Sequence, residues 1–166
     1  MAEGRLKIVV FGSFNAGKSS FIQALDPPRS RHIEASSEEG PTTVAFDFGR
    51  LTVRDKAVFL FGTPGGQERF EFVRQIISRG GMDGAIIVVD ATTGVDAMTR
   101  HLYDQLKALD VPLAFMANKC DSPGAVPEAV SHALPGGEMV HPISARNGGE
   151  NVHAALDAFV ATLTAR

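Results

Sequence analysis

The sequence predicts an α/β fold: a mostly parallel, six-stranded sheet with one antiparallel edge strand and helices on both faces. The first observation is that short apolar runs alternate with stretches whose apolar residues recur every three or four positions. The second is that several of the short runs are apolar throughout, as in strands buried on both faces. Such alternation is typical of a parallel sheet covered by helices.

Six apolar runs are the predicted strands, and they span residues 6–11, 44–53, 57–61, 85–89, 113–117 and 139–143. Only residues 54–56 separate the second run from the third, and a link this short allows only a hairpin. One strand at the edge of the sheet is therefore expected to run antiparallel. Segment 26–42 shows no clear pattern and is predicted to be a long functional or mobile loop.

Five helices are predicted between the strands, over residues 18–25, 68–78, 97–109, 127–134 and 148–163. In the last of them, Val152, Leu156 and Phe159 are spaced by four and three, which places them on one buried face. Pro127 suits the first turn of its helix. Ligands of such sheets lie beyond the carboxyl ends of the strands, so the loops after Phe11, Phe61 and Ala117 are expected to converge.

Composition sets limits on the class of protein. The chain has 166 residues with a net charge of −3, so we expect one domain over residues 1–166 and no nucleic-acid partner. A single cysteine, Cys120, favours a reducing compartment. Neither a signal peptide, nor an apolar run of membrane-spanning length, nor a common lipidation motif is found, which predicts a cytoplasmic chain with no intrinsic membrane anchor.

Residues 12–19 read G-S-F-N-A-G-K-S and match the phosphate-loop pattern G-x-x-x-x-G-K-[ST]. They follow a predicted strand and precede a predicted helix, which is the context of a P-loop NTPase. Backbone N–H groups and the helix N-terminus would bind phosphate oxygens, Lys18 would reach the outer phosphates and Ser19 would ligate Mg²⁺. The predicted nucleotide-binding residues here are Gly12, Phe14, Asn15, Ala16, Gly17, Lys18, Ser19 and Ser20.

Residues 118–121 read N-K-C-D and follow the fifth predicted strand. The Asp121 carboxylate can accept two hydrogen bonds from guanine N1–H and N2–H₂, donors that adenine lacks in that arrangement. Asn118 can bond the N7 and O6 side of the base and tether the loops, and the Lys119 stem can lie along the purine face. The segment predicts guanine rather than adenine.

N-K-x-D after the fifth strand resembles the guanine-reading element of the small Ras-like GTPases, and three further segments resemble other motifs of that family. Residues 144–146, S-A-R, resemble the S-A-K element, in which the alanine N–H binds guanine O6. Residues 41–49, P-T-T-V-A-F-D-F-G, resemble a Rab-type switch I, and residues 61–70, F-G-T-P-G-G-Q-E-R-F, resemble switch II. With N-K-x-D, these segments make nearly the whole chain resemble the small Ras-like GTPases, and more narrowly the prokaryotic relatives of the MglA group.

The resemblance implies GTP or GDP with Mg²⁺ as ligands, and assigns Ser144, Ala145 and Arg146 to the base. It makes Thr43 a second Mg²⁺ ligand beside Ser19, and Gln67 the residue that positions water. The backbone of Gly65 or of Gly66 would contact the γ-phosphate. It also implies an effector or a Roadblock-type activating partner at the switch segments.

Three positions depart from this family pattern. Gly62 replaces the aspartate that holds Mg²⁺ through water. One interpretation has Asp90 assist the metal through water, and the favoured interpretation makes Asp90 a turn residue at the end of its strand. The pair Gly65-Gly66 adds a glycine before Gln67, which leaves two registers open and loosens that segment. Phe14 is large for its place in the phosphate loop, near the γ-phosphate. There it would block an arginine finger supplied from outside, shield the site from water or pack against switch II.

The resulting prediction is a GTP-binding molecular switch that hydrolyses GTP slowly and depends on an activating partner. Two alternatives stay open. One is a binding module that holds GTP without hydrolysing it. The other is a P-loop kinase or ATPase, which the N-K-x-D segment disfavours.

Overall fold

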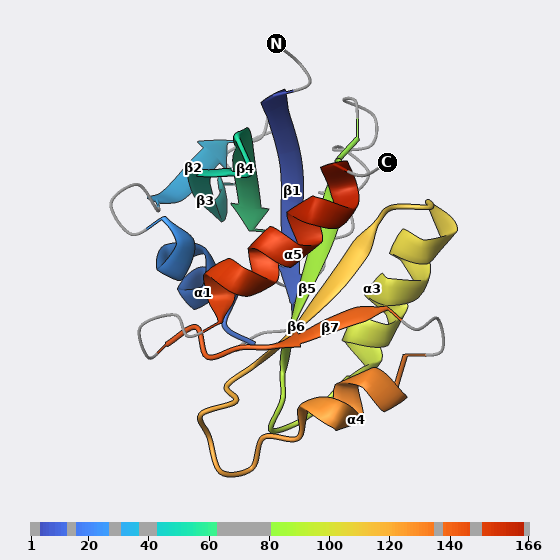
Figure 1. Ribbon diagram of the computed structural model, residues 1–166. Helices are drawn as coiled ribbons and strands as arrows, with labels where there is room; N and C mark the ends of the chain where they lie inside the picture. The colour runs from blue at the N-terminus through green and yellow to red at the C-terminus, as the bar shows by residue number, and fades with distance from the viewer. Residues whose placement is uncertain are drawn as a thin grey trace.

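A computed structural model describes residues 4–12, 16–26, 31–36, 43–62, 81–134, 138–146 and 151–164. Over these residues the chain forms a seven-stranded sheet in the order β2-β3-β4-β1-β5-β6-β7 (Figure 1). The strands are β1 (Arg5–Gly12), β2 (Arg31–Ser36), β3 (Thr43–Val53), β4 (Lys56–Gly62), β5 (Gly84–Asp90), β6 (Leu113–Asn118) and β7 (Met139–Pro142). The described helices are α1 (Lys18–Leu25), α3 (Ala97–Ala108), α4 (Pro127–His132) and α5 (Val152–Thr164).

The sheet confirms the predicted mixed topology. Strands β4, β1, β5, β6 and β7 pair in parallel, whereas β3 runs antiparallel to β4. Arg54 and Asp55 link β3 to β4 and both have positive φ angles, of 50° and 64°. This geometry is typical of a two-residue type I′ turn, whose twist matches that of a β-hairpin.

Two details of the predicted sheet were wrong. The structure has a seventh strand, β2, which pairs antiparallel with β3 inside the segment predicted to be a loop. Because β2 takes the edge of the sheet, the antiparallel strand β3 is an inner strand. Residues 31–36 contain only Ile33 and Ala35 as apolar residues, so the alternation that indicates a strand is weak there.

Alternate residues of the central strands contribute to two separate hydrophobic cores, one on each face of the sheet. Ile86 and Val88 of β5 pack with α1 and α5, whereas Ile87 and Val89 pack with α3 and α4. In Figure 1, α5 crosses in front of the sheet, and its fully buried Phe159 lies in the first core. Both faces of β5 are therefore covered, as its continuous apolar run predicts.

The helix boundaries agree closely with the prediction where they are described. Helix α1 spans the predicted residues, α3 ends one residue early, and α4 ends at His132 rather than at residue 134. Helix α5 is described from Val152 onward, and the predicted helix 68–78 lies outside the described residues. Among the described residues, no helix has the length and hydropathy needed to cross a membrane.

The end of α1 is tied to β3 through a buried carboxylate. The Arg50 backbone N–H donates to Asp26 Oδ2 at 2.7 Å, and Asp26 is only 6% exposed. This hydrogen bond satisfies the buried carboxylate and fixes the helix against the sheet. The C-terminal end of the helix that follows the phosphate loop is thereby held against β3.

Candidate functional site

The carboxyl ends of the parallel strands bring the predicted site together. Gly12 ends β1, Asp90 ends β5 and Asn118 ends β6, and these three strands are direct neighbours. Segment 143–146 follows directly after β7, which lies beside β6. These four segments, far apart in the sequence, therefore begin at the same end of the parallel strands. Two of them follow Phe11 and Ala117 and belong to the three loops predicted to converge, whereas the third predicted loop follows Phe61, and its residues 63–80 lie outside the described residues.

The described part of the phosphate loop turns sharply into α1. Gly17 precedes the helix with a left-handed φ of 103°, and the Phe21 N–H donates to its carbonyl at 2.9 Å. A Cβ atom on Gly12 would lie 2.8 Å from the Val88 carbonyl oxygen, so this position also requires glycine. Lys18, Ser19 and Ser20 form the first turn of α1, the end of a helix that favours negatively charged groups. Phe14 and Asn15 lie outside the described residues.

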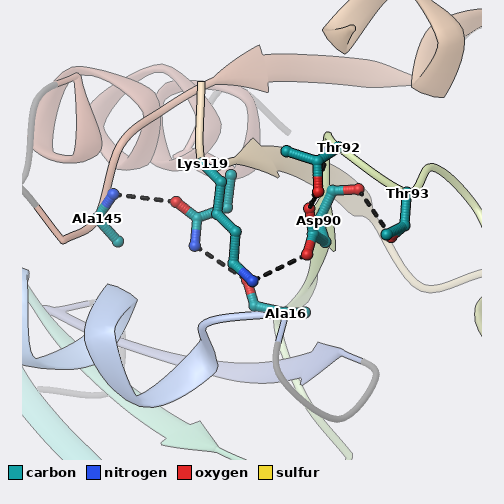
Figure 2. A network of polar contacts seen from close by, with 7 residues as sticks. Ala16, Asp90, Thr92, Thr93, Lys119 and Ala145 are labelled. Carbon is teal, nitrogen blue, oxygen red and sulfur yellow. Dashed lines mark hydrogen bonds and ion pairs between the residues drawn. The ribbon is translucent and has the colours of Figure 1, made fainter. Parts of the chain in front are cut away.

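Asn118 joins the phosphate loop to the segment after β7, and Figure 2 labels its two partners, Ala16 and Ala145. Its Nδ2 donates to the Ala16 carbonyl at 2.9 Å, and its Oδ1 accepts from the Ala145 N–H at 3.0 Å. The side chain is only 3% exposed. A Cβ atom on Gly17 would lie 2.2 Å from Asn118 Nδ2, so the loop can approach this amide only because residue 17 is glycine. The two hydrogen bonds of Asn118 are the geometry that its predicted tethering role requires.

Lys119 forms an ion pair with Asp90. Lys119 Nζ lies 2.8 Å from Asp90 Oδ2, while Asp90 Oδ1 accepts from the Thr92 N–H at 2.8 Å and from the Thr92 hydroxyl (Figure 2). Burial raises the pKa of the Asp90 carboxyl, but the hydrogen bonds from Lys119 and Thr92 outweigh it and hold that pKa below its ordinary value. Asp90 thus ends its strand in a turn, the interpretation that the sequence favours. Its ion pair with Lys119 was not predicted.

The N-K-C-D segment is held by backbone hydrogen bonds, one to the residue that follows β7 and one within its own turn. The Cys120 N–H donates to the Ile143 carbonyl at 3.1 Å, and the Ser122 N–H donates to the Lys119 carbonyl at 3.0 Å. Asp121 is exposed, as a residue that meets a ligand requires. Burial raises the pKa of the Cys120 thiol, which keeps it protonated near neutral pH.

The residues assigned to the base after β7 differ in exposure. Ser144 and Ala145 are 4% and 6% exposed, whereas Arg146 is exposed. The Ala145 N–H, which the resemblance assigns to guanine O6, here donates to Asn118 Oδ1. A base oxygen at this position would therefore share that N–H with the asparagine.

The predicted metal ligands and switch residues are described only in part. Ser19 lies in the first turn of α1, Thr43 begins β3 and Gly62 ends β4. Since β3 runs antiparallel to β4, the first residue of β3, Thr43, lies toward the same end of the two strands as the last residue of β4, Gly62. The predicted catalytic residues Gly65, Gly66 and Gln67 lie outside the described residues. In the part of the chain that the structure describes, no group of three histidine, cysteine or acidic side chains could hold a metal ion.

Comparisons with known proteins agree with this arrangement. Residues 3–163 match the family described as the elongation factor Tu GTP binding domain. An uncharacterized protein of Methanocaldococcus jannaschii is 35% identical over 121 residues, which cover 73% of this chain and 74% of that protein. Translation initiation factor IF-2 of Alkaliphilus oremlandii is 33% identical over 162 residues, which cover 90% of this chain. The chain spans only 21% of that initiation factor.

Solved structures show the same fold at low sequence identity. The G domain of the T. maritima FeoB iron transporter has a TM-score of 0.70 and 20% identity, and the alignment covers 98% of this chain and 99% of that one. Aquifex aeolicus Era has a TM-score of 0.69 and 21% identity, over 98% of this chain and 56% of that one. The chain therefore belongs to the elongation factor Tu GTP-binding domain family, among the P-loop GTPases.

Proposed function

We propose that this chain is a molecular switch that binds GTP with Mg²⁺, hydrolyses it slowly to GDP and phosphate, and signals its nucleotide state to a partner. The observation that carries the proposal is the Asn118 bridge, which joins the predicted phosphate loop to both predicted base segments. A nucleotide has its base at one end and its phosphates at the other. A rigid link between the two recognition elements matches that shape.

In this proposal the base lies at Asp121, whose carboxylate accepts from guanine N1–H and N2–H₂. The Lys119 stem covers one face of the purine. Ala145 offers guanine O6 a share of the N–H that donates to Asn118, and Arg146 and Ser144 complete the segment. The exposure of Asp121 beside the buried Asn118 supports this division between a residue that contacts the ligand and one that holds the loops.

The phosphates lie at the phosphate loop and the first turn of α1. The left-handed Gly17 and the close approach at Gly12 support a loop whose backbone, rather than its side chains, faces the ligand. Lys18 binds the outer phosphates, and Ser19 and Thr43 are the proposed Mg²⁺ ligands. Hydroxyl oxygens suit this hard cation, which keeps several waters and so needs few protein ligands. The metal, when bound, neutralises charge on the phosphates.

The switch segments are the part of the proposal that depends on the sequence resemblance. Thr43 and the backbone of Gly65 or Gly66 contact the γ-phosphate, and hydrolysis releases both segments. Gln67 positions the attacking water. A partner of the Roadblock type, as in the MglA group, or another effector binds these segments. The same proposal places the chain in the cytoplasm, as a single G domain over residues 1–166.

Extraction of the nucleotide from the purified protein, with its identification by chromatography, tests the ligand. We expect GDP or GTP, and we expect excess ATP not to displace fluorescent GDP. Displacement by ATP would contradict the guanine assignment and would favour the kinase or ATPase alternative. Phosphate release in a single turnover then separates the switch from a non-hydrolysing module.

The expected intrinsic rate is at or below ~10⁻³ s⁻¹, near the slow rates of GTPases without an arginine finger. Deleting Gly66 restores the family spacing before Gln67 and should raise this rate, and a further change of Gln67→Ala should remove the gain. Turnover above ~0.1 s⁻¹ by the protein alone would contradict this account, because catalysis by Gln67 without an arginine is slow. No detectable release over several hours would favour the binding module.

A further inference from the structure

The carboxylate of Asp90 divides its two oxygen atoms between two tasks. Oδ1 accepts the N–H and the hydroxyl of Thr92 and so fixes the turn after β5. The Asp90 carbonyl adds to this turn by accepting from the Thr93 and Gly94 N–H groups at 3.1 and 2.8 Å. Oδ2 accepts from Lys119 Nζ at 2.8 Å. The turn thus immobilises the carboxylate that holds the lysine.

Lys119 has a backbone and a side chain that both benefit from such support. Its backbone has a left-handed φ of 67°, an uncommon conformation for a residue other than glycine. A lysine side chain has many rotamers, and ordering it opposes binding. The side chains of Lys119 and Asp90 are 31% and 18% exposed, so the pair is partly shielded from solvent, and an ion pair in such a place is stronger than one on an open surface.

We propose that Asp90 is a positioning residue for base recognition, and that it acts by holding the Lys119 side chain in the conformation that covers the purine. This inference rests on the proposed function, because it requires that a guanine base lie at Lys119. With the lysine ordered in advance, the bound base does not have to restrict its rotamers. Asp90 therefore favours guanine nucleotide binding without touching the nucleotide or the metal.

The variant Asp90→Asn tests this idea with little disturbance of shape. An amide has one acceptor oxygen where the carboxylate has two. Because the two carboxylate oxygens face different partners, Asn at this position can accept from Thr92 or from Lys119, but not from both. When the oxygen stays with Thr92, the amide NH₂ faces the lysine ammonium, and two donors meet. We expect GDP to bind about tenfold more weakly, mainly through faster dissociation, as for the loss of one charge-assisted hydrogen bond.

A double-mutant cycle identifies the route of the effect. Lys119→Met keeps an unbranched side chain but removes the ammonium, so Asp90→Asn should change GDP affinity less than ~2-fold in that background. Glu138→Gln is the matched control. It also changes a carboxylate to an amide, at a carboxylate that pairs with a lysine, Lys107, at 3.0 Å. Glu138 comes directly before β7, so it lies at the end of that strand opposite to the candidate site. This variant should leave GDP affinity unchanged.

Fluorescent GDP titration and dissociation kinetics, with and without EDTA, distinguish the outcomes. The proposal is supported if Asp90→Asn weakens binding to the same extent in EDTA and the effect disappears with Lys119→Met. It is overturned if Asp90→Asn binds as the wild type does, if its effect persists in the Lys119→Met background, or if EDTA abolishes the effect, since Asp90 would then serve the metal. A wild-type chain that binds no GDP would instead overturn the proposed function.

Discussion

Gly17→Ala is expected to be among the most damaging single-methyl additions at this site, for two separable reasons. Residue 17 has a φ of 103°, a conformation that disfavours an alanine by about 1–2 kcal/mol. The added Cβ would also lie 2.2 Å from Asn118 Nδ2. The Asn118 side chain is buried and bonded at both ends, so it can move only by giving up its hydrogen bond to the Ala16 carbonyl.

A buried carbonyl left without its donor lowers stability by about 1–3 kcal/mol. Together the two effects predict a loss of about 2–5 kcal/mol in the free energy of unfolding. For a chain of this size, that corresponds to a fall in Tm of roughly 5–15 °C. Thermal unfolding of the nucleotide-free protein measures it directly, without any contribution from ligand binding.

Gly94→Ala is the matched control, because Gly94 also has a left-handed φ, of 84°, but a Cβ there would meet nothing within 4 Å. It should show the backbone effect alone, about 1–2 kcal/mol. In an Asn118→Ala background the clash is absent, so Gly17→Ala should there cost no more than Gly94→Ala does. Equal Tm losses for the two glycine variants in the wild-type background, or an unchanged Gly17→Ala effect after Asn118→Ala, would refute this reasoning.

Three further predictions address the base, the metal and the pH dependence of stability. Asp121→Asn should weaken GTP binding by ~2–4 kcal/mol and improve binding of xanthine nucleotides in a competition titration, because a charged double acceptor becomes an amide; unchanged GTP affinity would contradict the base assignment. Thr43→Ala should leave GDP affinity nearly intact but abolish the difference in protease sensitivity between the GTP and GDP forms, and if Thr42→Ala does so instead, the register is off by one. Burial raises the pKa of the Glu138 carboxyl, but the hydrogen bonds from Tyr103 and Lys107 outweigh it and hold that pKa below 4.5, so its contribution is present above pH 4.5 and is lost as the pH falls through the lowered pKa. The stability gap between wild type and Glu138→Gln, from urea titrations at pH 7 and pH 3, should therefore shrink at the lower pH, and a gap that stays constant would count against the pair.

The inner part of the fold was predictable because its strands are apolar on both faces. Runs such as residues 85–89 contain no polar residue, which is typical of a strand buried on both faces, and each run is followed by a turn or a motif. Strand β2 was not predictable in the same way, because Ile33 and Ala35 alone give too little hydrophobic signal. Strand β2 pairs with β3 through residues that are close in sequence, such as Ser36 and Thr43. Because β3 is itself held by β4, the tertiary context rather than local sequence decides whether β2 forms.

For the site, motif spacing predicted which residues gather but not how they are held together. The role of Asn118 as a tether followed from its place in N-K-x-D, whereas its two partners, Ala16 and Ala145, offer only backbone groups that carry no sequence signal. The ion pair of Asp90 with Lys119 has a weak signal, namely an acidic residue ending the strand beside the one that ends at Asn118. This signal becomes useful only when the pairing of β5 with β6 is known, because that pairing places Asp90 beside Asn118.

The Asn118 bridge also has a consequence for the order in which the molecule matures. Its two hydrogen bonds join residues 102 and 27 positions apart, so both can form only after the chain has been made as far as Ala145. Contacts of such long separation form late in folding, because the intervening chain must first be closed into a loop. During synthesis from the N-terminus, β1 and the phosphate loop emerge long before the segments predicted to bind the base, residues 118–121 and 144–146. A nascent chain therefore acquires its full affinity for a nucleotide only after Ala145 has been made and has come to lie beside Asn118, and tight binding then reports that nearly the whole sheet is in place.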